Sequence, residues 1–451
     1  MLAGILFYSV AHYGGVERTD RYTYLLALGV AAVAASVVRA GVREVPRLGG
    51  VYRWVLTLLP VYVLFQLIPL PSSLVAAFSP ARGQVLTALR SIGAGPAYTT
   101  FSVFPSATLQ KLLLLSGYIA LFLMVRELTW YFRERPWAVA LPLVVAAAYE
   151  ALVGMSQLGT PDAVQGIHGD YVNRNHFAGL LEMCLPFAAV YPLALLRRTR
   201  RRGGIAGSVA LQASVSWLAA AAMLGALVYS LSRMGFFAAM LSLAGIGILL
   251  VASSRRVRRT VSWKKWVAVG SAAVAIPVGF LLLSPDALIA RIAHLTKDDE
   301  ITEGRADLWK ETTKLIAAYP LFGCGLGGFE SAFPKYKVAG AEVSDDYAHN
   351  DYLQVLAELG VVGAGMVFLL AVWIVRAALV AFLSASEADA GSLALACMGA
   401  LAAIMLHSFT DFNLYIPSNA LVLAWVSAMA VGLLRTSRKP DKAVLRVVSY
   451  S

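Results

Sequence analysis

The stretch HNDYLQVLAELGVVGAGMVFLLAVWIVRAALVAFL, residues 349–383, joins a polar start to a long apolar run. Its first three residues are His349, Asn350 and Asp351, and they precede an amphipathic run that ends in Gly360. After Gly360 the sequence is almost entirely apolar for longer than the roughly 20 residues that a helix needs to cross hydrocarbon. The stretch therefore predicts a short helix with polar residues at its start, followed by a membrane-spanning helix.

The composition of the whole chain indicates an integral membrane protein. Of its 451 residues, 59% are hydrophobic and 14% are charged, whereas soluble domains carry about 25% charged residues. A net charge of +12 is compatible with nucleic-acid binding, but the basic residues fall in short clusters between apolar segments. Such clusters are typical of cytoplasmic loops under the positive-inside rule, so we expect the lipid bilayer, and no nucleic acid, as the electrostatic partner. The clusters lie at 39–53, 126–135, 197–202, 255–265 and 435–442.

Hydropathy predicts an all-α polytopic protein with about twelve transmembrane helices and a single membrane domain, 1–451. If successive spans cross the membrane in opposite directions, every basic cluster lies on one face of the membrane. The positive-inside rule makes this face cytoplasmic, and both termini lie on it. The longest connection, 285–359, then lies on the opposite face, with helix-like segments at 305–319 and 351–359. The expected spans are 1–14, 22–40, 54–70, 108–126, 137–157, 177–196, 211–231, 235–252, 266–284, 360–383, 391–408 and 417–434.

Ionisable residues gather on this outer face. An ionisable side chain held at the membrane is costly and suggests a functional site. Individual residues of this face can also be explained without a functional site. Arg174 could be an interfacial arginine, Arg305 a solvated helix residue, and Asn350 and Asp351 helix-capping residues. Arg233 is harder to explain in this way, because it stands between two apolar runs on the face that positive charge avoids. The stretches are 173–176, 232–234, 304–311, 349–351 and 407–413, with Arg174, His176, Arg233, Arg305, His349 and Asp411.

Two other patterns have structural explanations. The segment GCGLGGF, residues 323–329, lacks the context of a nucleotide-binding loop, so its glycines predict a tight turn or a close backbone approach. Cys184, Cys324 and Cys397 lack metal-ligand spacing and predict packing residues. We therefore expect neither a metal site nor a cofactor.

The outer-face residues suit chemistry on a phosphate. Guanidinium groups are always charged and bind phosphate oxygens in pairs, so several arginines can hold a pyrophosphate without a metal. Histidine is the side chain whose ordinary pKa suits a general base near neutrality. A helix starting just after His349 would disfavour the imidazolium and keep the ring ready to accept a proton.

Five segments together resemble the O-antigen ligase and O-antigen polymerase superfamily in order and spacing, over about 150–430. The resemblance implies a GT-C-type membrane glycosyltransferase that takes a glycan from undecaprenyl pyrophosphate on the periplasmic face of the bacterial inner membrane. The segments are NRNHFAG (173–179), SLSRMG (230–235), GRADLW with YPLFGCGLGGF (304–329), HNDYLQVLAELG (349–360) and HSFTDFNLYIP (407–417).

The resemblance also implies roles for individual residues. Arg233 and Arg305 match arginines that hold the lipid pyrophosphate, and His349 matches the histidine that activates the acceptor hydroxyl. Arg174 is a further phosphate ligand, and Asp411 orients an arginine or the histidine. Transfer would invert the anomeric centre without a metal.

The acceptor stays open at this point. We expect an O-antigen ligase, whose acceptor is lipid A-core. A polymerase that uses a second lipid-linked glycan and a protein O-oligosaccharyltransferase share the same motifs. A transporter of the lipid-linked glycan is the alternative from another class, but it predicts internal symmetry and charge near the midplane, whereas the charges here gather at one face.

Overall fold

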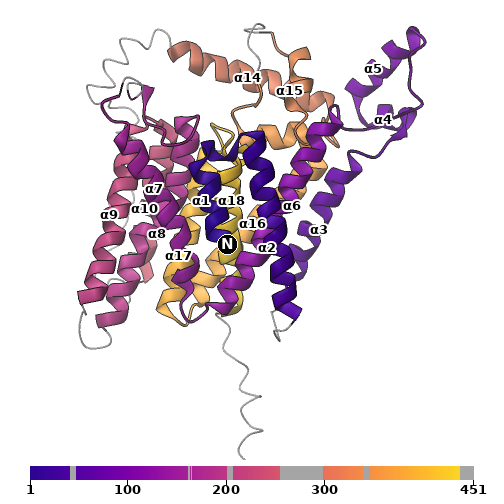
Figure 1. Ribbon diagram of the computed structural model, residues 1–451. Helices are drawn as coiled ribbons and strands as arrows, with labels where there is room; N and C mark the ends of the chain where they lie inside the picture. Colours follow the sequence, from indigo (N-terminus) through magenta and orange to yellow (C-terminus); the bar gives the residue numbers. More distant parts are fainter. Residues whose placement is uncertain are drawn as a thin grey trace, which may run out of the picture.

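The computed structural model describes residues 1–40, 47–160, 163, 165–200, 207–253, 298–338 and 345–436. Within these residues the chain folds into a helical bundle that carries a layer of short helices over one end (Figure 1). The helices of the bundle are α1 (Leu2–Ala11), α2 (Arg18–Ala40), α3 (Gly50–Phe65), α6 (Pro105–Tyr131), α7 (Leu141–Ser156), α8 (Arg174–Arg200), α9 (Gly207–Tyr229), α10 (Arg233–Ser253), α16 (Asp351–Ser384), α17 (Ala388–His407) and α18 (Pro417–Thr436). The layer over the end contains α4 (Ser72–Phe78), α5 (Pro80–Ser91), α14 (Asp298–Ala318) and α15 (Phe329–Ala332).

The all-α polytopic fold is confirmed. Among the described residues, seven helices are long and apolar enough to cross a membrane: α6, α8, α9, α10, α16, α17 and α18. The apolar helices α1, α3 and α7 are shorter, and the first turn of α2 carries charged residues that shorten its apolar part. The expected span at 266–284 lies outside the described residues.

Within the expected first span, 1–14, the structure has a helix that is shorter than expected. Helix α1 has 10 residues, and at 1.5 Å per residue it rises about 15 Å, half of the roughly 30 Å hydrocarbon core. A left-handed Tyr13 (φ 50°) and the glycine-containing turn Tyr13–Gly15 end the helix. Composition alone did not distinguish this short helix from a full span.

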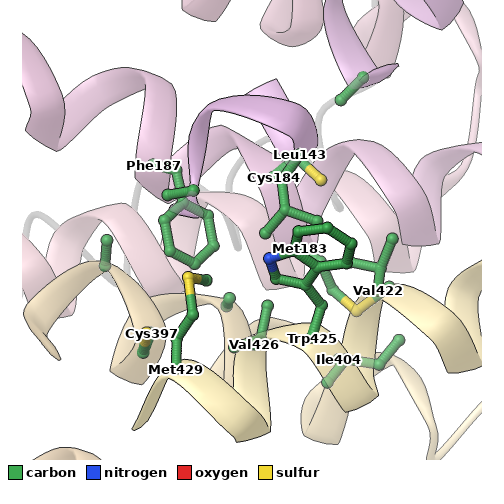
Figure 2. Close-up of a cluster of buried hydrophobic side chains, with 14 of the residues drawn as sticks. Leu143, Met183, Cys184, Phe187, Cys397, Ile404, Val422, Trp425, Val426 and Met429 are labelled. Atoms are coloured by element: carbon green, nitrogen blue, oxygen red, sulfur yellow. The ribbon is translucent and has the colours of Figure 1, made fainter. Parts of the chain in front are cut away.

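Close packing of α7, α8, α17 and α18 forms the centre of the bundle (Figure 2). Figure 2 shows the Trp425 ring among methionine, leucine and valine side chains, and its indole nitrogen donates to the carbonyl of Val139 at 2.9 Å. Because lipid tails are as apolar as leucine, such helices associate through tight packing and interhelical hydrogen bonds. At Gly399 of α17, where an added Cβ would lie 2.5 Å from Ile246 Cδ1, Ser242 Oγ donates to the carbonyl at 2.8 Å. All three cysteines are buried and free, as expected for packing residues.

A break at Gly360 divides α16 into an outer part and a spanning part, as the sequence predicts. Gly360 has φ 61° and ψ −175°, a conformation that other residues rarely adopt. The broken turn does not leave its polar groups unpaired, because the glycine-rich segment docks against it: the amides of Cys324 and Gly325 donate to Ala357 and Glu358 at 2.9 and 3.0 Å. The positive φ angles in this segment, at Gly323, Gly325 and Gly327, confirm the predicted tight turn.

The outer layer has a small apolar core of its own. Side chains of α5, α14 and α15 pack with Ala348 and Ala357 in a buried cluster that includes Leu315, Phe329 and Phe333. A two-stranded antiparallel sheet, β1 (Leu70–Pro71) and β2 (Tyr98–Thr99), closes the base of the α4–α5 excursion. The layer therefore fixes the segment 345–350 against the end of the bundle.

Candidate active site

Three helices begin at the same end of the bundle, beneath α14. Arg174 is the first residue of α8, Arg233 is the first residue of α10, and His349 lies two residues before the start of α16. α10 packs against α8 and α17, and α16 packs against α17 and α18. The topology thus brings together residues that are far apart in the sequence.

Asp411 connects two histidines at this end. Its Oδ1 atom lies 3.5 Å from His349 Nδ1 and 3.5 Å from His176 Nε2. Asp411 is buried, whereas the His349 side chain keeps 31% of its surface exposed. Of the two histidines, His349 is therefore the one that a substrate can reach.

Aromatic rings surround these groups. The Phe412 ring is nearly perpendicular to both imidazoles, with ring centroids 4.6 Å from His176 and 4.8 Å from His349. The Tyr347 ring stacks on Phe412 with centroids 4.2 Å apart. We call His176, Tyr347, His349, Asp411 and Phe412 the base cluster.

The charge state of the base cluster follows from these contacts. Burial raises the pKa of Asp411, but the imidazoles that face it lower it by more, so the net pKa lies well below its ordinary value and the group is a carboxylate. Burial raises the pKa of Tyr347 to about 12, so its phenol stays protonated near neutrality. Within the base cluster, only a histidine is suited to exchange a proton near pH 7.

The backbone at His349 is strained. Its φ of 47° lies in the left-handed region, which costs a residue with a side chain of the order of 1 kcal/mol. The neighbouring residue, Ala348, is held at both polar atoms by side chains: its amide donates to Gln354 Oε1 at 2.6 Å, and its carbonyl accepts from Trp309 Nε1 at 3.0 Å. These contacts impose the conformation that turns the imidazole toward Asp411.

Asn350 and Asp351 join the start of α16 to the turn between α17 and α18. Asn350 is the N-cap, accepting from the amides of Tyr352 and Leu353 at 3.0 and 3.1 Å. Asp351 is buried between the start of α16 and this turn. Its carboxylate accepts from Ser408 Oγ at 2.8 Å, and its amide donates to the carbonyls of Ser408 and Asp411. Both residues therefore fix Asp411 beside His349 without themselves facing the open side.

Arg174 and Arg233 border the same loop. An added Cβ on Gly166 would lie 2.3 Å from the carbonyl oxygen of Ser230 and 3.1 Å from Cδ of Arg174, so this glycine lies between the turn before α10 and the Arg174 side chain. The turn itself contains a left-handed residue, Leu231, with φ 56°. Arg174 also donates to the carbonyl of Gln165. The Arg233 side chain is exposed.

Arg305 approaches from the outer layer. It precedes Trp309 by four residues on α14, and residues at this spacing share one helix face. Because Trp309 donates to Ala348, this face of α14 is directed toward the segment before His349. The sequence places Arg305 at the start of a helix, which is wrong, because α14 begins at Asp298.

Arg174, Arg233 and Arg305 form what we call the arginine rim. In the described part of the chain, no carboxylate lies within ion-pairing distance of Arg233 or Arg305. Two of the three also stand at helix N-termini, where backbone amides and the dipole favour an anion. The rim is therefore arranged to receive negative charge from outside the chain.

Sequence reasoning missed the residues that support the site. Glu358 accepts from Gln354 Nε2 at 2.9 Å and from the hydroxyl of Tyr415 at 2.8 Å, and both Gln354 and Glu358 are buried. Glutamine and glutamate on one side of a membrane-entering helix were the available signal. His407, the first residue of the stretch 407–413, lies 3.0 Å from Glu182 in the bundle interior.

Residues 218–368 match the family model described as O-antigen ligase. The match covers 151 of the 451 residues, and over this segment the chain is similar to the O-antigen ligase family. The matched residues include Arg233, Arg305 and His349, whereas Arg174, His176 and Asp411 lie outside them. No curated protein matches the chain.

The similarity to this family agrees with the character of the site. Enzymes of the O-antigen ligase type are membrane glycosyltransferases, and a multi-pass helical bundle with its polar groups gathered at one end fits that class. Across the residues that the structure describes, no cluster of three histidine, cysteine or acidic side chains is arranged to hold a metal ion.

Proposed function

We propose that this protein transfers a glycan from undecaprenyl pyrophosphate to a hydroxyl of an acceptor, as an O-antigen ligase whose acceptor is lipid A-core. The observation that carries the proposal is the base cluster: a partly exposed histidine in a strained backbone, facing a buried carboxylate, at the end of the bundle where α8 and α10 begin with Arg174 and Arg233. General base and phosphate ligands are what this transfer requires.

His349 acts as the general base. Its Nδ1 atom faces Asp411 at 3.5 Å, which favours the tautomer with the proton on Nδ1 and leaves the Nε2 lone pair free. The acceptor hydroxyl gives its proton to Nε2 as its oxygen forms a bond to the anomeric carbon. The carboxylate of Asp411 then stabilises the imidazolium. His176 supports Asp411 from the other side.

The arginine rim holds the leaving group. As the new bond forms, the bond between the anomeric carbon and the pyrophosphate oxygen breaks, and the electron pair leaves with the pyrophosphate. Attack from the opposite side inverts the anomeric centre. Guanidinium groups of Arg233, Arg305 and Arg174 bind the phosphate oxygens and offset the charge that develops on them.

This account assigns no step to a divalent ion, because three guanidiniums supply the positive charge that the pyrophosphate requires. Purified protein should therefore keep its transfer activity in the presence of a chelator. Loss of activity on chelation, restored by adding back a divalent ion, would show that the charge is supplied by a metal.

We infer that the site faces the periplasm and that the protein lies in the bacterial inner membrane with its termini in the cytoplasm. The basic clusters at 126–135 and 197–200 support this orientation, because α6 and α8 both end there, at the end of the bundle opposite the arginine rim (Figure 1). Accessibility of a single cysteine at Val172 to a membrane-impermeant reagent in intact cells tests the orientation. The reagent should label Val172→Cys and leave Arg135→Cys unlabelled.

The acceptor is tested directly with purified protein. Undecaprenyl-pyrophosphate-linked glycan is supplied together with lipid A-core in one reaction and alone in another. A ligase consumes lipid A-core and yields one glycan–lipid product. Elongation of the donor glycan in the absence of lipid A-core would instead establish a polymerase, and neither product from active donor would overturn the proposed function.

A further inference from the structure

A group of cations outside the arginine rim lies on the other side of the bundle. Helix α2 packs against α6, and neither packs against α8 or α10 (Figure 1). Between α2 and α6 the surface has a shallow hollow whose polar lining residues are Arg18, Arg21 and Gln110. Its other lining residues are Tyr22, Leu25, Leu113 and Leu114.

The charge on this hollow is not compensated within the chain. In the described residues, neither Arg18 nor Arg21 has a carboxylate within ion-pairing distance, and Arg21 Nε donates to the carbonyl of Glu17 at 3.4 Å. Asp20, which lies between them in sequence, is turned away and accepts from the hydroxyl of Tyr8 at 2.8 Å. The hollow therefore combines two positively charged side chains with apolar lining residues.

The hollow is connected to the base cluster through α6. On this helix Lys111 directly follows Gln110, which lines the hollow. Lys111 Nζ lies 5.7 Å from the centroid of the Tyr347 ring and 5.1 Å from that of the Tyr415 ring. Tyr347 in turn stacks on Phe412, whose ring is nearly perpendicular to the His349 imidazole. The hollow is thus next to the base cluster, on the side away from Arg174 and Arg233.

The surface below the hollow suits a lipid tail. Exposed apolar side chains at helical spacing, Tyr22, Leu26, Val30, Val33 and Val37, follow α2 away from Arg18. On α6 the exposed side chains Leu109 and Leu113 flank the same surface. A lipid whose anionic headgroup binds at Arg18 and Arg21 can therefore lay its hydrocarbon chain along the apolar face of α2.

We propose that the hollow between α2 and α6 binds the phosphate of the acceptor, and that the acceptor is therefore a phosphate-bearing lipid that enters from this side. This inference rests on the proposed function and assigns the two substrates to opposite sides of His349. The donor pyrophosphate binds the arginine rim, and the acceptor phosphate binds Arg18 and Arg21. The acceptor glycan then extends across Lys111 and Tyr347 to place its hydroxyl at the histidine.

Binding is measured first, without turnover. Full-length protein carrying Arg233→Ala and Arg305→Ala is placed in nanodiscs of phosphatidylcholine and titrated with radiolabelled farnesyl phosphate. We expect saturable binding that excess inorganic phosphate does not displace. Adding Arg18→Ala and Arg21→Ala should weaken it by at least about tenfold, whereas the matched pair Arg90→Ala and Lys314→Ala, exposed cations at the same end, should not.

The role in transfer is measured second. In the otherwise wild-type enzyme, Arg18→Ala with Arg21→Ala should raise KM for the acceptor by about tenfold and leave KM for the donor unchanged. The proposal would be overturned by two results together: phosphatidylglycerol displaces farnesyl phosphate as well as unlabelled farnesyl phosphate does, and the double variant keeps the wild-type KM for the acceptor. The hollow would then be a general site for anionic lipids. If the wild-type enzyme transfers no glycan, the proposed function is refuted, and the acceptor role is refuted with it. The binding measurement decides separately whether the hollow holds a lipid phosphate.

Discussion

The base cluster and the arginine rim lie at the same end of the bundle but are built differently. His349 is positioned by a strained backbone, a fixed neighbouring residue and a buried carboxylate. Arg233 is exposed, and neither it nor Arg305 has an acidic partner among the described residues. In the proposed mechanism, the fold therefore sets the proton acceptor in advance, whereas the phosphate ligands become ordered when the donor binds.

The largest effect should come from disturbing the base cluster. Asp411→Asn keeps the shape of the side chain but removes the charge that favours the reactive tautomer and stabilises the imidazolium. We expect turnover to fall on the order of 10²-fold to 10⁴-fold, with donor affinity unchanged, as measured by transfer kinetics and donor titration. A fall below tenfold would mean that Asp411 only supports the fold.

The arginine rim should respond in donor affinity. Hydrogen bonds to charged groups contribute about 1.5–3 kcal/mol each, so Arg233→Ala or Arg305→Ala should weaken donor binding by roughly tenfold to hundredfold. Arg233→Lys should restore little, because lysine lacks the planar pair of donors. Arg90→Ala on α5, an exposed arginine at the same end, is the control. Full rescue by lysine would show that charge alone is needed.

The support of the base should have a smaller effect on turnover. Gln354→Ala leaves the amide of Ala348 without its buried acceptor, at a cost of about 1–3 kcal/mol, and releases the backbone before His349. We expect kcat to fall by about tenfold while KM for the donor stays the same. Gln84→Ala, which loses only an exposed contact with Lys335, should match the wild type. A change in donor KM alone would place Gln354 with the phosphate ligands.

Loss of the helix cap should affect stability more than chemistry. Asn350→Ala removes the acceptor for the amides of Tyr352 and Leu353, and N-cap substitutions cost about 1 kcal/mol. We expect a lower apparent Tm in detergent and a modest decrease in activity. Asn350→Ser, which retains a capping oxygen, should recover most of the Tm, and an unchanged Tm for Asn350→Ala would contradict the capping role.

The smallest effect concerns acid. The pKa of Asp411 is depressed in the folded protein, so its contribution to stability is fully present above its unfolded pKa of about 4 and is lost as pH falls through the lower folded value. The stability difference between wild type and Asp411→Asn should therefore be constant near neutrality and narrow below about pH 4. Thermal unfolding of both proteins from neutral to acidic pH measures this stability difference. A difference that becomes larger at acidic pH would contradict a depressed pKa for Asp411.

Parts of the site followed from sequence, because they depend on local patterns. The apolar run after Gly360, the polar start of α16 and the common face of the arginines all rest on helical periodicity and on the alternation of spans. The link between Gln354, Glu358 and Tyr415 did not follow, because it joins segments about 57 residues apart through side chains whose direction only packing sets. The early start of α14 was missed because its first turns are polar and show no apolar period.

The comparison between the two regions is tested most directly by one paired measurement. Donor affinity and single-turnover rate are determined for His349→Ala and Arg233→Ala in the same reconstituted preparation, with protein levels matched. We predict that His349→Ala binds donor as the wild type does but loses transfer, whereas Arg233→Ala binds donor weakly and recovers part of its rate at saturating donor. Transfer by His349→Ala at the wild-type rate, or loss of donor binding in that variant, would contradict the account.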